Sequence, residues 1–526
     1  MNIKIAMNTL LLWTGITGVS LAADVPPADE RPIVTPGIVA EQPAVRPGSK
    51  ASPNIVFIFA DDLGYGDLSS FGSQTIATPH LDSLADEGIK FTDFYAASPV
   101  CTPSRAALLT GRYPARMGIR HVFMADSMEG MPPGEITLAE QLQQAGYSTG
   151  LVGKWHLGHL DRYMPWNQGF DEFHGVPYSN DMGNFFFYHN REIDWTPIDQ
   201  RYLTQRYTQH ALDFIEAHRD GPFFLYLAHS MPHVPLYASP QFEGRSEGGL
   251  YGDVVEEMDW STGEILAKLD ALGIADNTLV VFSSDNGPWL MMRDHGGSSG
   301  ALRDGKGVTF EGGQRVPTLA RWPDGIAPGQ VYSKPASMLD WFPTFSALAG
   351  VPLPADRVID GEDISGVLAG REGAREEGFY YLASFSTRAV AYREGDWKLK
   401  LPRKGYPRFL DSVLQIGMYS HGTLLFNLAE DPREQVNLAA DYPDRVDAMR
   451  ERIDGFQNAI DAEDIRPLHM SQVASDKKGY NRVLIPVALT ALVTLGLVIL
   501  VVRWLYRAVR AVFRSRRKPA TTRDSH

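Results

Sequence analysis

The chain has 526 residues, 44% hydrophobic and 21% charged, which excludes a wholly disordered protein and predicts one large domain with additions or several domains. Its net charge is −14, and because residues 503–526 carry +7 and residues 1–23 carry +1, the body between them carries −22. Such an acidic body argues against nonspecific nucleic-acid binding, so no nucleic-acid partner is expected. The single cysteine, Cys101, excludes an intrachain disulfide and a zinc site built on several cysteines.

The N-terminal residues 1–23 are typical of a secretory signal peptide. Lys4 precedes an apolar stretch at 10–16, and Ser20-Leu21-Ala22 has the small residues of a cleavage site. An uncleaved N-terminal anchor is the alternative. Residues 24–50 contain six prolines and few large apolar residues, which predicts a linker.

The body alternates between strand-like and helix-like patterns. Continuous apolar runs at 54–60, 223–228 and 278–282 predict buried parallel strands, and amphipathic stretches at 138–145 and 254–272 predict helices. This order favours an α/β fold in which helices cover both faces of a mostly parallel sheet.

Carboxylates follow two of these predicted strands. Asp61 and Asp62 come after the first, and Asp285 and Asn286 come after the strand at 278–282. Ligands bind beyond the carboxyl ends of strands in open α/β sheets. Oxygen ligands without imidazole or thiolate favour Ca²⁺ or Mg²⁺ over Zn²⁺, although Asp and Asn in these places also occur as turn or capping residues.

Cys101 lies just before a predicted helix that includes residues 106–110. Helix N-termini favour negative groups, and Arg105, one turn further on, lies on the same face. Three interpretations stay open at this point: an anion pocket, a reactive thiol and a buried inert cysteine.

After about residue 380 the pattern changes. A hairpin at 388–401, a strand at 424–428 and a helix at 442–460 predict a smaller C-terminal subdomain over 381–465, followed by a polar spacer at 466–482. Residues 483–502 carry no charge and predict one transmembrane helix, with a buried core helix as the alternative. The basic tail 503–526 then predicts a cytoplasmic C-terminus, which could touch anionic lipids, and an anchored, extracytoplasmic (periplasmic or extracellular) body.

Two longer motifs carry a resemblance to a known family. Cys101-Thr102-Pro103-Ser104-Arg105, followed by Leu-Thr-Gly-Arg at 109–112, and the segment 146–158 resemble the two signatures of the sulfatase family. The resemblance runs from about Pro53 to about Ala440 and is closest to the arylsulfatase A and N-acetylgalactosamine-6-sulfatase branch. It implies an alkaline-phosphatase-like mixed sheet sandwiched by helices, with the catalytic domain at 51–380.

The resemblance also implies the chemistry. A separate formylglycine-generating enzyme would oxidise Cys101 to Cα-formylglycine, and Ca²⁺, in preference to Mg²⁺, would assist the hydrolysis of aryl or carbohydrate sulfate monoesters. The resemblance implies metal ligands, catalytic residues and substrate-binding residues as follows: Asp61, Asp62, Asp285 and Asn286 with modified Cys101 for the metal; Cys101, Arg105 and His156 for catalysis; Lys154, Ser179, His233 and Lys306 for the substrate. The histidines could instead be core residues and the lysines surface residues, and His229 is expected to be structural.

In the implied reaction, one hydroxyl of the hydrated aldehyde attacks sulfur while Asp285 takes its proton, and His233 with Lys306 assists the leaving alcohol. His156 then deprotonates the second hydroxyl and sulfate is expelled. Two alternatives remain: a phosphate or phosphonate monoester hydrolase of the same superfamily, and a non-catalytic protein that binds sulfated glycans if Cys101 is unmodified.

Overall fold

The computed structural model describes residues 52–463, except 184, 372, 374, 376, 377, 409, 410 and 412–416. The expected signal peptide, linker, spacer and basic tail therefore lie outside the described residues.

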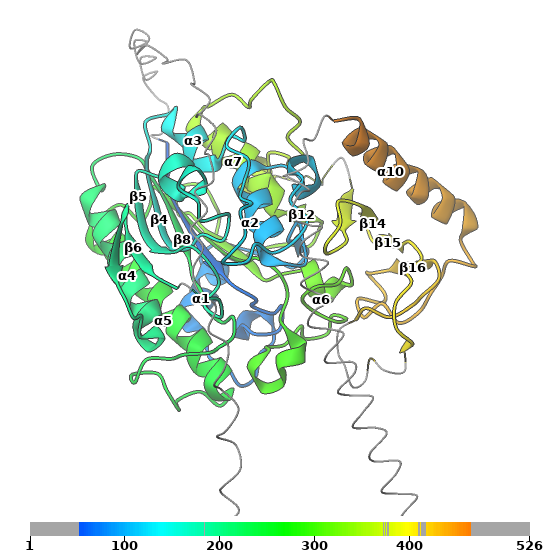
Figure 1. Ribbon diagram of the computed structural model, residues 1–526, viewed down its shortest axis with the longest axis horizontal. Coiled ribbons are helices and arrows are strands. Elements are labelled where there is room, and N and C mark those ends of the chain that lie inside the picture. Colours follow the sequence, from blue (N-terminus) through cyan, green and yellow to red (C-terminus); the bar gives the residue numbers. More distant parts are fainter. Residues whose placement is uncertain are drawn as a thin grey trace, which may run out of the picture. The chain divides into compact units, whose positions relative to one another are not determined.

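A ten-stranded sheet forms the centre of the molecule (Figure 1), in the order β11-β2-β10-β9-β1-β8-β4-β5-β6-β7. The five strands from β9 to β5 are parallel, whereas β10 on one side and β6 on the other are antiparallel to their neighbours. The sheet is therefore mixed, as the resemblance implied. Its strands are β1 Asn54–Ala60, β2 Ile89–Phe91, β4 Ser148–Lys154, β5 Glu172–Val176, β6 Phe187–His189, β7 Glu192–Trp195, β8 Phe223–Ala228, β9 Thr278–Ser284, β10 Thr318–Arg321 and β11 Gln330–Tyr332.

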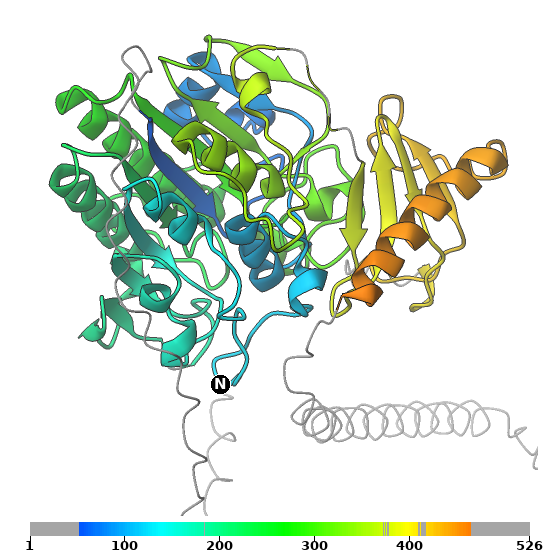
Figure 2. The ribbon, with the colours of Figure 1, turned by 90° about the horizontal axis from the view of Figure 1, so that it is seen from above.

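Helices cover both faces of this sheet (Figure 2). Successive side chains of a strand point to opposite faces, so the fully buried β1 sends Ile55, Phe57 and Phe59 into one core and Val56, Ile58 and Ala60 into the other. The first core is completed by residues of α2, α3 and α7, and the second by residues of α1, α4 and α5. The helices are α1 Pro79–Asp86, α2 Cys101–Thr110, α3 Leu138–Gln143, α4 Leu203–Ala217, α5 Gly249–Ala271, α6 Glu311–Gln314, α7 Trp341–Ala349, α8 Ser365–Leu368 and α10 Pro443–Ala462.

The strands predicted from apolar runs are confirmed, since β1 and β8 have the expected bounds and β9 is two residues longer than expected. The predicted helices are confirmed with shifted ends, as α3 and α5. The short pair β3 Phe94–Tyr95 and β12 Ala336–Ser337 forms a separate two-stranded sheet.

The C-terminal region forms an antiparallel sheet, β13 Phe379–Leu382, β14 Ala389–Glu394, β15 Trp397–Lys400 and β16 Leu424–Asn427, on which α10 packs. The predicted hairpin corresponds to β14 and β15. Lys398 of β15 forms buried ion pairs with Glu311 of α6 at 2.8 Å and with Glu434 at 3.0 Å, which join this sheet to the main body. The boundary near residue 380, like the other domain limits, stays a prediction.

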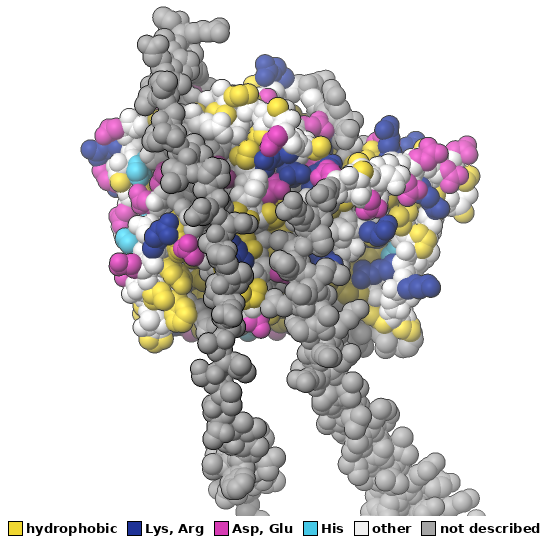
Figure 3. Space-filling view, turned by 45° about the horizontal axis from the view of Figure 1, so that its top comes forward, with side chains coloured by type: hydrophobic (Ala, Val, Ile, Leu, Met, Phe, Trp, Pro, Cys, Tyr) yellow, Lys and Arg dark blue, Asp and Glu magenta, His cyan; other side chains and the backbone are white. Residues whose placement is uncertain are grey.

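Acidic and basic side chains lie interspersed over the face seen in Figure 3.

The expected membrane anchor requires a correction. Within residues 52–463, no helix combines the length and the apolar composition needed to cross a bilayer. The longest, α5, carries charged residues along its length, and charged side chains are costly at the centre of a bilayer. The segment 483–502 lies outside the described residues. The fold of residues 52–463 therefore contains no transmembrane helix. This finding corrects the expectation of a membrane-anchored, extracytoplasmic body with a cytoplasmic tail.

Candidate active site

The polar residues predicted from the sequence meet at one edge of the central sheet. Asp61 and Asp62 follow β1, Asp285 and Asn286 follow β9, and Lys154 ends β4. Ser179 comes three residues after β5, and His233 lies in the segment after β8. These five strands are neighbours and parallel, so their carboxyl ends bring together residues that are far apart in sequence.

Four oxygen-bearing side chains form a buried cluster. The backbone N–H of Asp62 donates to Asp285 Oδ1 at 3.0 Å, and Asn286 Nδ2 donates to Asp62 Oδ1 at 2.7 Å. Asp61 Oδ1 and Asn286 Oδ1 are buried, and neither accepts a hydrogen bond from any described residue. Asp61 Oδ1 has only an ion-pair contact with Arg105 at 3.5 Å. Buried oxygens without hydrogen bonds are costly, so these two oxygens fit the ligand set of a hard cation.

Cys101 is the first residue of α2, and its side chain is buried. Its sulfur and carboxylate oxygens of Asp61 and Asp285 all lie within 4.8 Å of one another, so this group could hold a metal ion. Burial raises the pKa of the Cys101 thiol to about 11, outweighing the lysines nearby. The unmodified side chain is therefore a neutral thiol at pH 7, which argues against the interpretation of a reactive thiolate.

Arg105 is fully buried, one turn after Cys101. Its Nε donates to Asp285 Oδ2 at 3.0 Å, and one terminal nitrogen forms an ion pair with the same oxygen at 2.9 Å. Its other terminal nitrogen donates to the carbonyl of Lys154 at 3.1 Å. Burial lowers the pKa of the guanidinium, but Asp285 and Asp61 with the neighbouring Tyr226 and Cys101 together more than compensate, and the net shift is upward. Arg105 thus keeps a fixed positive charge beside the cluster.

Two lysines pair with the cluster. Lys154 Nζ lies 2.5 Å from Asp61 Oδ2 and 3.2 Å from Ser179 Oγ. Lys306 Nζ lies 2.6 Å from Asp62 Oδ2 and also contacts the ring of Trp289, 4.4 Å from its centroid. For Lys306, burial lowers the pKa, but Asp62 reverses this and raises it above its ordinary value.

His233 lies beside these lysines. Its Nδ1 donates to the carbonyl of Val234 at 2.6 Å, and its Nε2 is 3.6 Å from Asp62 Oδ2. Asn180 Oδ1 lies 3.2 Å from His233 Nδ1, and the Trp289 ring lies 5.5 Å from the His233 ring. Neither Asn180 nor Trp289 stands out in the sequence, although each lies within three residues of a predicted site residue.

His156 has a constrained orientation and one unoccupied nitrogen. Its backbone has φ 61°, a strained conformation for a non-glycine residue. Its Nε2 lies 3.0 Å from the carbonyl of Phe123, which can only accept, so Nε2 carries the proton. Nδ1 is buried and unpaired among the described residues. Burial, reinforced by Lys154 and Arg105, holds the pKa of His156 well below its ordinary value, so the ring is neutral.

Comparison with known proteins identifies the family of the chain. The Sulfatase family model matches residues 53–351. The chain belongs to the sulfatase family. This sulfatase is 37% identical to rat steryl-sulfatase, over 82% of its own length and 93% of the relative's. It is 45% identical to mouse N-acetylgalactosamine-6-sulfatase, over 76% and 85% of the two chains. Among solved structures, it resembles a Pseudoalteromonas sulfatase with a TM-score of 0.71 at 29% identity, over 78% and 91% of the chains.

These relatives confirm the resemblance to the arylsulfatase A and N-acetylgalactosamine-6-sulfatase branch. Sulfatases are sulfuric ester hydrolases, so the protein is an enzyme that hydrolyses sulfate esters.

Proposed function

We propose that this sulfatase hydrolyses aryl or carbohydrate sulfate monoesters with Cα-formylglycine, made from Cys101, and a bound Ca²⁺ ion. The observation that carries the proposal is the charge arrangement at the sheet edge. Arg105, Lys154 and Lys306 pair with Asp61, Asp62 and Asp285, and the sulfur of Cys101 lies within 4.8 Å of oxygens of Asp61 and Asp285. A divalent cation on the carboxylates would leave a net positive site around residue 101, which suits a sulfate monoester.

Asp61, Asp62, Asp285 and Asn286 would hold the metal, with residue 101 beside it. Several protein oxygens in one cluster suit Ca²⁺ better than Mg²⁺, which usually retains more of its water. When bound, the ion would neutralise negative charge on the sulfate oxygens. The hydrated aldehyde would supply an oxygen nucleophile in place of the neutral thiol, and a formylglycine-generating enzyme would act on Cys101 during maturation.

Side chains of this protein would bind the sulfate group, balance charge and transfer protons. Lys154 and Lys306 would bind the sulfate group once the metal takes their present carboxylate partners, and Ser179 would orient Lys154. Arg105 would hold residue 101 and balance the charge of Asp285. In the metal-free cluster, burial and the neighbouring Asp61 raise the pKa of Asp285 to about 7. Asp285 would take the proton of the attacking hydroxyl. His233 and Lys306 would assist the departing alcohol.

His156 would act as a base through Nδ1. Because Nε2 is held by Phe123 and the ring is neutral, the Nδ1 lone pair is available to accept a proton. This supports the role of releasing sulfate in the second half of the reaction.

The test is mass spectrometry of the peptide that contains Cys101, on protein purified with the maturation enzyme, together with hydrolysis of an aryl sulfate and an aryl phosphate. We expect the aldehyde at residue 101 and a clear preference for the sulfate. Cys101→Ala, the matched control, should abolish hydrolysis. Sulfate release at full rate by protein with an intact thiol would overturn the proposal, and preference for the phosphate would favour the phosphate or phosphonate hydrolase.

A further inference from the structure

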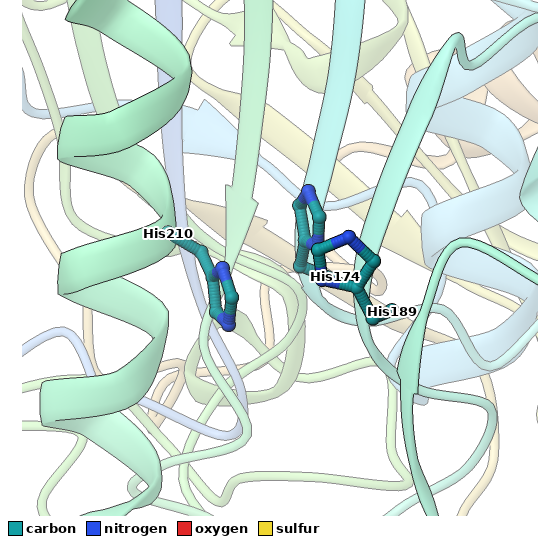
Figure 4. A group of neighbouring side chains, drawn as sticks. All are labelled: His174, His189 and His210. Atoms are coloured by element: carbon teal, nitrogen blue, oxygen red, sulfur yellow. The ribbon is translucent and has the colours of Figure 1, made fainter. Parts of the chain in front are cut away.

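Three histidines outside the candidate active site lie close together (Figure 4). His174 lies on β5, His189 is its direct partner across the antiparallel pair with β6, and His210 lies on α4. One ring nitrogen from each lies within 4.8 Å of the other two. Nothing in the reaction uses these residues, and they lie 15 and 21 positions apart in the sequence.

His174 has the environment of a metal-binding histidine. It is only 6% exposed, and its Nε2 lies 3.2 Å from a carboxylate oxygen of Glu172. Its Nδ1 is buried and has no hydrogen-bond partner within the described part of the chain. A carboxylate on one nitrogen of a ligating imidazole fixes the ring and makes the other nitrogen more basic. The unpaired Nδ1 is therefore the nitrogen available to a ligand.

Glu172 is itself held in place, because His218 binds its second oxygen at 2.9 Å. Glu172 therefore bridges two imidazoles, His174 and His218, one on each carboxylate oxygen. Arg206, one turn before His210 on α4, is paired with Asp194 and stacks on Phe187 and Trp195.

The three rings pack closely enough for small movements to bring their nitrogens together. The His174 ring lies 4.5 Å from each of the other two rings, centroid to centroid. The His174 and His210 rings are parallel, so binding one ion requires one of them to turn about its Cβ–Cγ bond. Zinc–nitrogen bonds are about 2.0–2.1 Å long, so the nitrogens must also close up.

We propose that His174, His189 and His210 bind a Zn²⁺ ion, with water in the fourth position, at a site separate from the oxygen cluster at the strand ends. Imidazole nitrogens suit Zn²⁺, whereas Ca²⁺ prefers oxygen ligands, so the two sites would select different ions. The ion would tie α4 to the β5–β6 pair. Because β5 leads directly to Ser179, the site would stabilise the framework that carries one side of the substrate pocket.

The proposal is tested by titrating Zn²⁺ into the calcium-saturated protein, with a chromogenic zinc indicator as competitor. Unmodified Cys101 with its carboxylates could also take zinc, so the informative quantity is the difference between wild type and His189→Ala. His189 is exposed, which makes this substitution safe for folding. We expect wild type to bind one more zinc ion per chain than His189→Ala. Glu172→Gln should weaken that site about 10- to 100-fold.

The matched control is His80→Ala, which removes an exposed histidine outside the cluster. It should bind zinc as wild type does. Equal zinc binding by wild type and His189→Ala would overturn the proposal, and so would an equal loss in His80→Ala, which would mean surface binding only. His189→Ala should retain aryl sulfate hydrolysis with calcium alone, so a failure here is distinguishable from a failure of the proposed function.

Discussion

Nδ1 of His156 has no hydrogen-bond partner in the described part of the chain and can accept a proton. If this atom accepts the proton that releases sulfate, His156→Ala should release about one alcohol per enzyme and then slow about 10²- to 10⁴-fold, the usual contribution of a general base. Separate measurements of alcohol and of free sulfate in the first turnover would check this. His80→Ala should leave both phases unchanged. Repeated turnover by His156→Ala with equal alcohol and sulfate would show that the base lies elsewhere.

His229 differs from His156 because neither of its ring nitrogens has a partner among the described residues. Burial lowers its pKa to about 3, against about 6.5 when unfolded. Between these values the unfolded chain binds a proton that the folded chain does not, so this residue makes stability fall as the pH falls.

His229→Leu should therefore reduce the loss of stability between pH 6 and pH 4. The slopes of unfolding free energy against pH should differ by at most the effect of one proton, which is about 1.4 kcal/mol per pH unit. Urea unfolding at a series of pH values would measure it. Parallel pH profiles for the variant and wild type would mean that His229 does not control acid stability.

At the scale of the element, β4 depends on a glycine immediately before Lys154. Gly153 has φ +115°, and a Cβ there would lie 1.9 Å from the carbonyl oxygen of Ala228 on the neighbouring β8. Gly153→Ala should therefore lower the free energy of unfolding by about 2 kcal/mol or more and displace Lys154, which reduces activity. Gly146→Ala is the matched control, since Gly146 also has positive φ but no atom within 4 Å of the added Cβ. Equal losses in both variants would show that φ alone matters.

The C-terminal sheet depends on the buried pairs of Lys398 with Glu311 and Glu434. Lys398→Met would leave two buried carboxylates without this partner, and removing one member of a buried ion pair costs about 3–5 kcal/mol. We expect a cost of about 3 kcal/mol in chemical denaturation, because Arg393 and Arg315 still lie near Glu311. Lys404→Met, at an exposed lysine, should change stability little. A similar small effect of Lys398→Met would indicate that packing, not the ion pair, holds the sheet.

For the whole molecule, the proposed calcium site joins β1 and β9 and should couple metal binding to global stability. Calcium at one hundred times its dissociation constant would stabilise the folded state by about 2.7 kcal/mol. Calorimetry should show a higher melting temperature with calcium than with a chelator. Asn286→Ala should reduce this shift, while His189→Ala should retain it. An unchanged melting temperature on calcium addition to wild type would contradict the proposed site.

Much of the fold could be predicted from local patterns. The continuous apolar runs of β1 and β8 fix strands that are buried on both faces, and their bounds agree with expectation. The sequence did not resolve β4, which contains two glycines, or β5, which begins with Glu172 and contains His174. Nor could it give the order of the strands, because hydrogen bonding between strands depends on residues far apart in the chain.

The sequence by itself determined which groups are available: Cys101 within its motif, carboxylates after two strands, and the lysines and histidines that the family motifs single out. Tertiary structure alone decided their partners and protonation. It pairs Lys154 with Asp61 and Lys306 with Asp62, leaves Nδ1 of His156 without a hydrogen-bond partner among residues 52–463 that the structure describes, and brings His174, His189 and His210 together. The physical reason is that pKa values and contacts depend on burial and on charges from other strands, and neither is encoded at any single position.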